Sequence, residues 1–497
     1  MREIQHKDGR VELDDPKPLE GSPLYNPDLA PVRVADRKWT TYNYAALWIS
    51  MAHCIPTYML ASGLMGGGMS WGQALFTILL GNSIVLVPIL LNSHPGTKYG
   101  IPFPVFARAS YGVYGSNLPA LLRALVACGW FGIQSWIGGM ALHRFIKTLV
   151  PDWDTMLGQV AQDGFFAGTT PTQFLCFLAF WGLQILIIFK GMDLLRKVEN
   201  WAAPYVLVMT AFLVGWAIWK VHGLGPIMDA PGRFGWGSPA FWKLFIPSLT
   251  GMIGYWATLS LNMPDFTRFG ESQREQAVGQ IVALPTTMTV FAAMGVIITS
   301  ASAVIYGKAI WDPVELVSKF DSVGIVLVSM FTVIVATLAV NIAANVVSPA
   351  NDFANAFPRH INFGRGGLIT GLIAIAMRPW YLLSNPAKYI DEWLVGCAGA
   401  LGSIAGVLIA DYWLLRDRRL ALADLYKPEG AYRYQSGWNP AAALATIAGC
   451  APVFLGRYAI DSLRFFFDYA WFASFAIAGG VYLALMWSKR ATLAARL

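Results

Sequence analysis

The chain has 497 residues, of which 56% are hydrophobic and only 13% are charged. So little charge excludes a soluble globular protein of this length and is typical of a protein that crosses a membrane many times. The net charge of +7 reflects basic loops, and no basic patch interleaved with aromatic residues indicates a nucleic-acid partner.

Long windows without Asp, Glu, Lys or Arg indicate eleven membrane spans. A span needs about 20 apolar residues, and the first window is long enough for two of them. The windows are residues 39–97, 124–143, 164–189, 200–219, 244–264, 276–307, 322–351, 393–410, 434–456 and 469–488. We expect a twelfth span over 366–384, where Gly367 and Gly371 have the spacing of close helix packing although Arg378 interrupts the segment.

Twelve spans place both termini on one side of the membrane. Lys and Arg gather in the N-terminal segment and in the loops on that side, so the positive-inside rule predicts cytoplasmic termini in the inner membrane of a cell. Residues 1–38 are polar, contain five prolines and lack the apolar run of a cleavable signal. We expect them to form a mostly unstructured cytoplasmic tail that braces the inner face, and residues 489–497 to form a second cytoplasmic tail.

The first span, residues 42–64, contains His53, Cys54 and Pro56 near its middle. Proline removes a backbone donor and clashes with the preceding turn, so we expect this helix to break. Broken backbone at membrane depth is tolerated only where it lines protein or a cavity. Further on, the Gly- and Pro-rich segment 94–119 is expected to be an ordered cytoplasmic re-entrant or surface loop between the second and third spans.

The third span carries Trp130 and Gln134, four residues apart and therefore on one helix face. An indole stacked above an amide can hold a flat heterocycle by its face and its edge. Core packing and an interhelical hydrogen bond explain the pair equally well. The fourth and fifth spans offer no residue of comparable interest.

The sixth span, residues 245–263, is the second one that we expect to be broken. Gly251, Gly254 and Pro264 oppose a regular helix around Trp256. This expected break comes five spans after the first one. That spacing predicts two inverted five-helix repeats that meet at a site in the membrane midplane.

The domain organisation follows from these repeats. The first repeat is expected over residues 39–222 and the second over 223–416. A cytoplasmic loop and two peripheral helices then occupy 417–488. The predicted fold is an all-α polytopic membrane protein with 12 transmembrane helices, in contact with the lipid bilayer.

The eighth span holds the densest set of polar side chains, in the stretch 336–356, ATLAVNIAANVVSPANDFANA. Asn341 and Asn345 lie four residues apart and share one helix face, as do Asn351 and Asn355. A primary amide in hydrocarbon must find partners. This face is therefore expected to point at a neighbouring helix, a cavity or a ligand.

The sequence contains no nucleotide-binding, metalloprotease or nucleophile-elbow motif, and its five cysteines lie inside spans without disulfide or metal spacing. We therefore expect a transporter rather than an enzyme, without a cofactor or a metal centre. Broken helices expose carbonyls and helix dipoles that can coordinate a cation, which favours an ion-coupled symporter. The residues able to carry a proton are His53, Asp265 and Asp352. A neutral histidine, and aspartates paired with Arg268 and Arg359, are the alternatives.

Several sequence blocks resemble the nucleobase/cation symporter-1 family, which includes carriers of purines, pyrimidines, allantoin and hydantoins. They are AALWISMAHCIPTY, HPGTKYGIPFPVFARASYGVYG, WFGIQSW, NMPDFTRF, NIAANVVSPANDFANAFPR and GVLIADYWLLR, and the resemblance spans residues 31–482. The IPTY and PDFTRF segments look most like bacterial allantoin permeases. The resemblance implies the LeuT-like fold, with broken helices 1 and 6 in a 5+5 inverted repeat and two peripheral helices.

The resemblance also implies a substrate site. In the hydantoin transporter of this family two tryptophans sandwich the ligand, and their positions match Trp130 and Trp256. Its hydrogen-bonding amides match Gln134 and Asn345, and Asn341 is nearby.

Two of the matching positions differ from that transporter. A glutamine of its first span corresponds to Cys54, and a glycine beside its second tryptophan corresponds to Tyr255. Both differences imply a ligand other than an aryl hydantoin, with a changed polar edge.

The sodium site of that relative uses carbonyls that match Ser50, His53 and Ala336, and two side-chain hydroxyls that match Ala339 and Val340. Neither hydroxyl is present here. Loss of two of about five oxygen ligands weakens a sodium site severely. The coupling ion is H⁺ or Na⁺, and the missing hydroxyls favour H⁺.

We predict a secondary active symporter that imports a small, planar, largely uncharged nitrogen heterocycle, such as a nucleobase, allantoin or a hydantoin, with a monovalent cation. An amino-acid or amine carrier of the same fold is one alternative, although it needs a counter-charge that the middle of these spans lacks. A non-transporting substrate sensor is the other.

Overall fold

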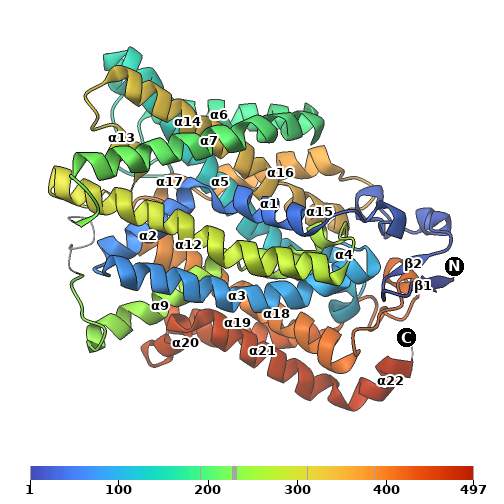
Figure 1. Ribbon diagram of the computed structural model, residues 1–497. Helices are drawn as coiled ribbons and strands as arrows, with labels where there is room; N and C mark the ends of the chain where they lie inside the picture. Colours follow the sequence, from blue (N-terminus) through green and yellow to red (C-terminus); the bar gives the residue numbers. More distant parts are fainter. Residues whose placement is uncertain (1, 191, 226–231, 311, 386, 496–497) are drawn as a thin grey trace.

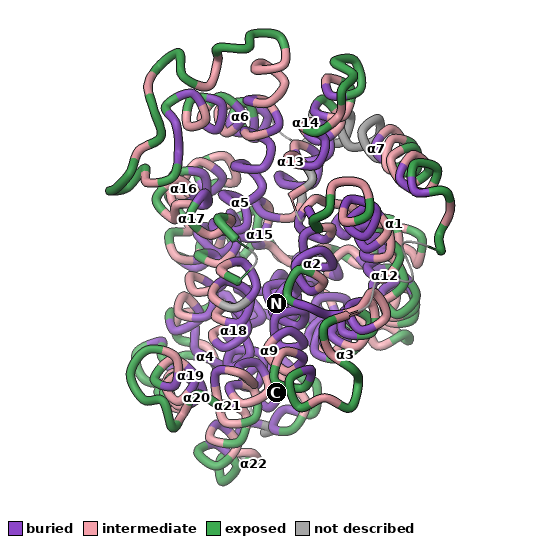
Figure 2. Tube along the Cα trace, turned by 90° about the vertical axis from the view of Figure 1, so that its left-hand side faces the viewer, coloured by how far each residue is buried: buried purple, intermediate pink, exposed green. Residues whose placement is uncertain are grey.

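The protein is described here by a computed structural model that covers residues 2–190, 192–225, 232–310, 312–385 and 387–495. Regular structure in these ranges is helical apart from one short hairpin. The long helices run side by side along one bundle, and both chain ends lie at the same end of it (Figure 1). Seen along the bundle, buried segments gather around α2, α5, α9 and α18, and exposed segments lie at the periphery (Figure 2).

The elements of the first half of the chain are β1 (Glu3–Gln5), β2 (Val11–Leu13), the 3-10 turns η1 (Lys17–Gly21), η2 (Pro27–Leu29) and η3 (Val34–Asp36), α1 (Thr41–Ala52), α2 (Ile55–Gly66), α3 (Trp71–Tyr99), α4 (Phe103–Tyr111), α5 (Asn117–Leu149), η4 (Pro151–Thr155), α6 (Pro171–Lys190) and α7 (Met192–Lys220).

The elements of the second half are α9 (Pro239–Tyr255), α10 (Leu259–Asn262), α11 (Pro264–Thr267), α12 (Gln273–Tyr306), α13 (Pro313–Val317), α14 (Val323–Asn345), α15 (Val347–Ala356), α16 (Phe363–Ala376), α17 (Pro379–Leu382), the π-helical η5 (Lys388–Leu394), α18 (Val395–Ile409), the π-helical η6 (Ala410–Leu415), the 3-10 turns η7 (Ala423–Tyr426), η8 (Asp461–Leu463) and η9 (Trp487–Lys489), and the helices α19 (Pro440–Tyr458), α20 (Arg464–Asp468), α21 (Ala470–Met486) and α22 (Arg490–Ala495).

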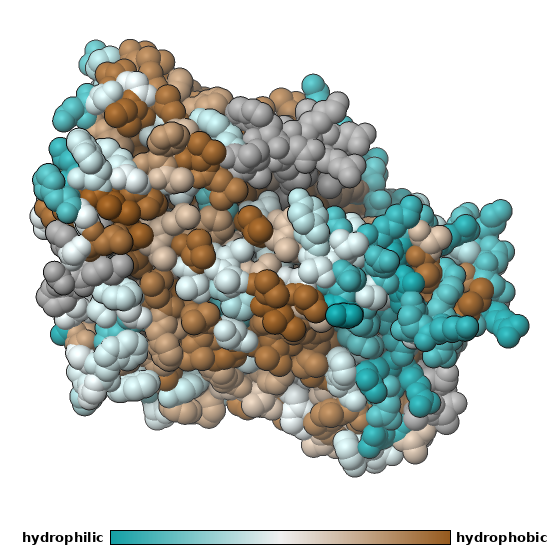
Figure 3. Space-filling view, viewed as in Figure 1, coloured by the Kyte–Doolittle hydropathy of each residue, from teal (hydrophilic) through white to brown (hydrophobic). Residues whose placement is uncertain are grey.

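Within the described ranges, eight helices are long and apolar enough to cross a membrane, and a ninth span results if α9 and α10–α11 count as one bent pair. Other predicted spans correspond to shorter apolar helices, such as α16 for the segment 366–384. The count of twelve stays a prediction. The flank of the bundle is largely hydrophobic, and the end that carries the N-terminal hairpin is hydrophilic (Figure 3).

Helical structure is interrupted at two of the places where the sequence opposes it. α1 ends at Ala52, and α2 starts at Ile55 with Pro56 in its first turn, where a missing N–H is tolerated. α9 ends at Tyr255, and α10 starts only at Leu259, so that the pair bends by 43°. Both interruptions contribute residues to the pocket described below.

The N-terminal segment is folded over residues 2–38, so the expectation of a mostly unstructured tail is wrong. β1 pairs with β2, and leucines of the following turns are buried against the end of the bundle. Arg37 explains much of this order, because its buried guanidinium donates to the carbonyls of Val11 (2.9 Å) and Thr97 (3.0 Å). Sequence patterns do not reveal such contacts between a polar segment and distant backbone.

The expected loop 94–119 is also mostly helical. α3 continues to Tyr99, and α4 follows with every residue buried. The glycine at 96 serves close packing rather than a turn, because a Cβ there would lie 2.8 Å from the Cα of Pro264. Gly367 and Gly371 pack closely as predicted, against Ile188 and Trp181 of α6.

Candidate functional site

A small cavity of about 20 Å³ lies where the two helix interruptions meet α5 and α14. Its lining is mostly apolar and, among the described residues, contains no charged side chain. The lining residues are Met51, Cys54, Trp130, Gln134, Tyr255, Trp256, Thr258, Leu259, Ala344 and Asn345. We call this cavity the central pocket. Six of the seven residues that the sequence nominates for substrate binding are therefore brought together.

Aromatic rings form two walls of the central pocket. Tyr255 contacts Trp130 and Trp256 edge-on, with ring centroids 5.0 and 4.9 Å apart. Trp48 supports Trp256 from behind at 5.1 Å, and Trp393 supports Trp130 at 6.1 Å. Rings held edge to face in this way keep their orientation, so the two indoles are fixed before any ligand arrives.

Two polar atoms in the central pocket are buried without a hydrogen-bond partner. They are the amide oxygen Oε1 of Gln134 and the indole nitrogen Nε1 of Trp256. An unpaired buried polar group typically costs about 1–3 kcal/mol. A ligand with a ring N–H and a carbonyl would satisfy both atoms, because one accepts and the other donates a hydrogen bond.

Asn341 is the predicted substrate residue that does not line the central pocket. Its amide nitrogen donates to the carbonyl of Phe131 (3.0 Å) and to Oε1 of Gln184 (2.8 Å), and its oxygen accepts from Nδ2 of Asn345 (2.9 Å). Asn341 therefore joins α14 to α5 and α6 and orients Asn345, which does reach the pocket.

Gln184 and Ser135 complete this network and are not singled out by the sequence analysis. Gln184 donates to Ser135 Oγ at 2.9 Å, and both side chains are buried. A glutamine deep inside the apolar fourth span is the signal that could have identified it, because an amide there needs partners.

Cys54 lies in the first helix interruption, Tyr255 lies at the start of the second, and the two side chains are hydrogen-bonded to each other. The phenol oxygen of Tyr255 lies 3.2 Å from Sγ of Cys54 and 3.0 Å from Oγ1 of Thr57. The two positions that differ from the hydantoin transporter thus form one contact.

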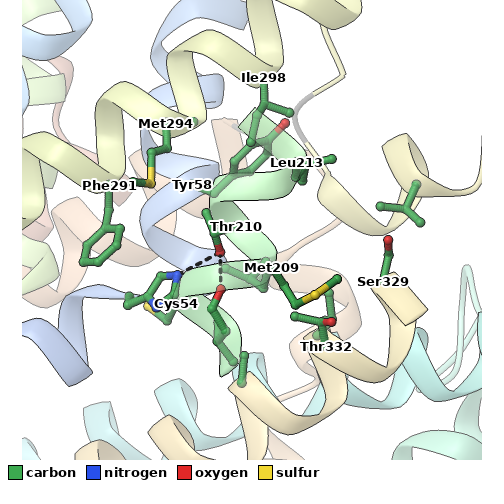
Figure 4. A pocket seen from close by; sticks show the side chains of 17 residues that line it. Cys54, Tyr58, Met209, Thr210, Leu213, Phe291, Met294, Ile298, Ser329 and Thr332 are labelled. Atoms are coloured by element: carbon green, nitrogen blue, oxygen red, sulfur yellow. Dashed lines mark hydrogen bonds between the residues drawn. The ribbon is translucent and has the colours of Figure 1, made fainter. Parts of the chain in front are cut away.

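Two of the residues proposed for a cation site line a second, larger cavity of about 120 Å³ between α2, α7, α12 and α14 (Figure 4). His53 and Ala336 line this cavity, whereas Ser50, Ala339 and Val340 are not part of its lining. Ala339 packs with Val335 against Tyr205 of α7. Among the described residues, no group of three or more His, Cys, Asp or Glu side chains could hold a metal ion.

His53 has a defined partner across this cavity. The hydroxyl of Thr210 donates to the carbonyl of Val206 (2.8 Å), so it accepts from Nε2–H of His53 at 3.0 Å (Figure 4). The imidazole also stacks on Phe291, with centroids 4.4 Å apart. Thr210 belongs to the fifth predicted span, where the sequence indicated no site residue.

Asp265 and Asp352 are buried away from both cavities. Asp352 forms an ion pair with Arg123 at 3.2 Å rather than with Arg359. Asp265 accepts from the backbone N–H of Phe103 at 2.9 Å, and its second oxygen has no hydrogen-bond partner. Arg123 belongs to α5 and is 229 residues away from Asp352 in the chain, so sequence patterns do not predict this pair.

A family model described as "permease for cytosine/purines, uracil, thiamine, allantoin" matches residues 31–473. The chain belongs to this permease family. Among relatives of the permease, the allantoin permease of Bacillus subtilis (strain 168) is 42% identical over 464 residues, 93% of each chain. The purine-uracil permease of Arabidopsis thaliana is 40% identical over 473 residues, 93% of this chain and 78% of that protein.

The permease also resembles a solved structure of Mhp1, a nucleobase-cation-symport-1 family transporter in a closed conformation with bromovinylhydantoin bound. The TM-score is 0.76 at 25% identity, over 95% of this chain and 100% of that chain. The predicted family, the helical membrane-protein fold and the prediction of a transporter rather than an enzyme are confirmed by these matches.

Proposed function

We propose that this permease is a symporter that imports a small, planar nitrogen heterocycle, and that the central pocket binds it. The observation that carries the proposal is the pair of unpaired polar atoms on Gln134 and Trp256 in a mostly apolar lining. A nucleobase, allantoin or a hydantoin presents N–H and C=O groups on a flat ring and satisfies both atoms.

The roles of the pocket residues follow from their chemistry. Trp130 and Trp256 stack on the ring, and Gln134 and Asn345 bind its amide edge. A stacked base contributes about 1–3 kcal/mol per aromatic face and a hydrogen bond about 1 kcal/mol. Micromolar affinity, about 8 kcal/mol, is therefore within reach without a charged anchor.

We further propose that the fold consists of twelve spans in two inverted repeats, over 39–222 and 223–416, with two peripheral helices in 417–488. Cytoplasmic tails 1–38 and 489–497 face the same side of an inner membrane. The hydrophilic end of the bundle, where both termini lie, supports this orientation (Figures 1 and 3). The helix interruptions at the pocket support the repeat arrangement.

The coupling cation is proposed to be H⁺ rather than Na⁺. The support is the loss of oxygen ligands at the expected sodium position, because Ala339 and Val340 carry no hydroxyl. Among the described residues, no group of three or more His, Cys, Asp or Glu side chains replaces them. His53, Asp265 and Asp352 are the residues on which a transported proton can reside.

Uptake of radiolabelled allantoin, uracil and hypoxanthine into proteoliposomes tests the identity of the coupling ion. A pH gradient should drive accumulation, and stimulation by Na⁺ at constant pH would overturn the proposal.

The same preparation separates the alternatives. A sensor would bind a heterocycle without flux, and an amino-acid carrier would accumulate leucine or phenylalanine instead. The absence of a charged side chain from the described pocket lining disfavours a zwitterionic ligand. Failure of every heterocycle to accumulate, with active reconstituted protein, would reject the proposed function.

A further inference from the structure

Tyr255 lines the central pocket and contacts both of its indole walls. It is the last residue of α9, and its ring is 95% buried. Beside its edge-on contacts with Trp130 and Trp256, only about 20 Å³ of free space remains in the cavity. Ligand pockets usually measure about 300–1,000 Å³. The central pocket is therefore nearly closed in this conformation, and its own side chains, Tyr255 among them, fill it.

The ring of Tyr255 is held at its outer end by hydrogen bonds. Its hydroxyl contacts Thr57 Oγ1 at 3.0 Å and Cys54 Sγ at 3.2 Å, and these two atoms are themselves 3.4 Å apart. The three groups belong to α9, α2 and the first helix interruption. A rotamer change of Tyr255 would break two hydrogen bonds inside a buried site, where unpaired groups are unfavourable.

The backbone that carries Tyr255 is also fixed. A Cβ at Gly254 would lie 2.2 Å from the carbonyl oxygen of Leu394, and one at Gly251 would lie 3.1 Å from Cγ2 of Ile390. These glycines let α9 pack directly on η5 and α18. α9 therefore has no room to retreat from the pocket when a larger ligand enters.

We propose that Tyr255 is a specificity-determining residue that sets the upper size limit of the substrate. The central pocket then accepts compact heterocycles and rejects those with an aromatic or similarly bulky ring substituent. This inference rests on the proposed function. It adds that selectivity comes from a rigid wall rather than from a missing hydrogen bond.

The test compares uptake of two probes, unsubstituted hydantoin and 5-benzylhydantoin, by the wild-type protein and by Tyr255→Ala in proteoliposomes. The variant should raise the ratio of benzylhydantoin to hydantoin uptake at least tenfold. Tyr255→Phe keeps the ring and loses only the hydroxyl contacts, so its ratio should stay close to that of the wild type.

Leu259→Ala is the matched control, because it also removes bulk from the pocket lining but leaves Tyr255 in place. An equal gain in Leu259→Ala would indicate general loosening and would overturn the assignment to Tyr255. A wild-type protein that already accumulates benzylhydantoin as well as hydantoin would also overturn it. If Tyr255→Ala is too unstable to reconstitute, Tyr255→Leu supplies a smaller wall with a buried apolar side chain, and the same ratio decides. A protein that accumulates no heterocycle at all contradicts the proposed function instead.

Discussion

The central pocket differs from a second buried polar region in how its polar atoms are paired. This second region, which we call the charged cluster, surrounds Asp411 and Arg416 at the hydrophilic end of the bundle. In the cluster, Asp411 accepts from Arg416 Nε (2.7 Å), Ser110 Oγ (2.9 Å) and Tyr482 OH (2.8 Å). In the central pocket, Gln134 Oε1 and Trp256 Nε1 are equally buried but have no partner. Both regions are shielded from solvent, so burial alone does not explain the difference.

The comparison separates structural polarity from binding polarity. A buried charge that stabilises a fold must have its partners in the protein itself. A pocket that binds a polar ring must instead keep donors and acceptors available, and the surrounding packing must offset the unfavourable energy of leaving them unpaired. Substitutions in the two regions should therefore affect different measurements.

The largest expected effect is on the stability of the charged cluster. Asp411→Ala leaves the Arg416 guanidinium buried beside Ala109 and without its carboxylate. Breaking one side of a buried pair typically costs about 3–5 kcal/mol. Thermal unfolding of the purified variant should show a clearly lower midpoint, together with reduced expression.

A surface pair provides the control for that measurement. Asp417→Ala removes the carboxylate that contacts Arg490 at 3.2 Å, and both side chains are roughly half exposed. Exposed pairs contribute about 0–1 kcal/mol, so the midpoint should hardly change. Equal midpoints for Asp411→Ala and the wild type would contradict the structural role of the cluster.

Asn341 shares features of both regions. Its side-chain amide has hydrogen-bond partners in the protein, as in the charged cluster, yet it lies next to the central pocket. Asn341→Ala removes donors to Phe131 and Gln184 and the acceptor that orients Asn345. We expect a loss of about 1–3 kcal/mol in stability. Substrate uptake should fall as well, measured on the same preparation. Reduced uptake at unchanged stability would instead place this amide in direct contact with the substrate.

Substitution of Gln134 should affect substrate uptake rather than stability, the opposite of what we expect for the charged cluster. Gln134→Ala removes no hydrogen bond recorded within the protein, so the unfolding midpoint without substrate should not fall. Uptake should fall at least tenfold, which corresponds to about 1.4 kcal/mol of lost ligand interaction.

Gln280 is a matched amide for this experiment. Its amide nitrogen donates to Ser93 Oγ (3.1 Å) and to Gln276 Oε1 (2.6 Å), away from the central pocket, whereas its Oε1 lacks a partner like that of Gln134. Gln280→Ala should lower the unfolding midpoint with little change in apparent substrate affinity. If both glutamine variants behaved alike, the assignment of Gln134 to substrate binding rather than to the fold would fail.

Local sequence patterns predicted the features that depend on residues close together in the chain. Apolar windows located the long helices, and prolines and glycines indicated where α1 and α9 end. The spacing of four residues placed Trp130 and Gln134 on one helix face, and both side chains line the central pocket. The family resemblance added Trp256 and Tyr255, whose role cannot be read from spacing.

Long-range partners could not be predicted in this way. Arg123 pairs with Asp352, and Gln184 with Asn341, over 229 and 157 residues, and neither partner is encoded by a motif. The order of the N-terminal segment was missed for the same reason, because backbone carbonyls of distant elements accept its hydrogen bonds. Composition alone describes that segment as polar and proline-rich, which is typical of disorder.

The smallest expected effect concerns this N-terminal segment, whose polar groups are paired like those of the charged cluster. Asn26 Nδ2 donates to the carbonyls of Pro358 (2.8 Å) and Ile361 (3.1 Å), and its oxygen caps η2 by accepting from the backbone N–H of Asp28 (2.9 Å). Asn26→Ala should weaken this local attachment by about 1 kcal/mol, since a cap and hydrogen bonds are lost. Amide hydrogen exchange in residues 20–30 should quicken, while the global midpoint and exchange in α5 stay unchanged, because local opening does not require the bundle to unfold. Unchanged exchange in residues 20–30 would mean that the buried leucines and Arg37 hold the segment without Asn26.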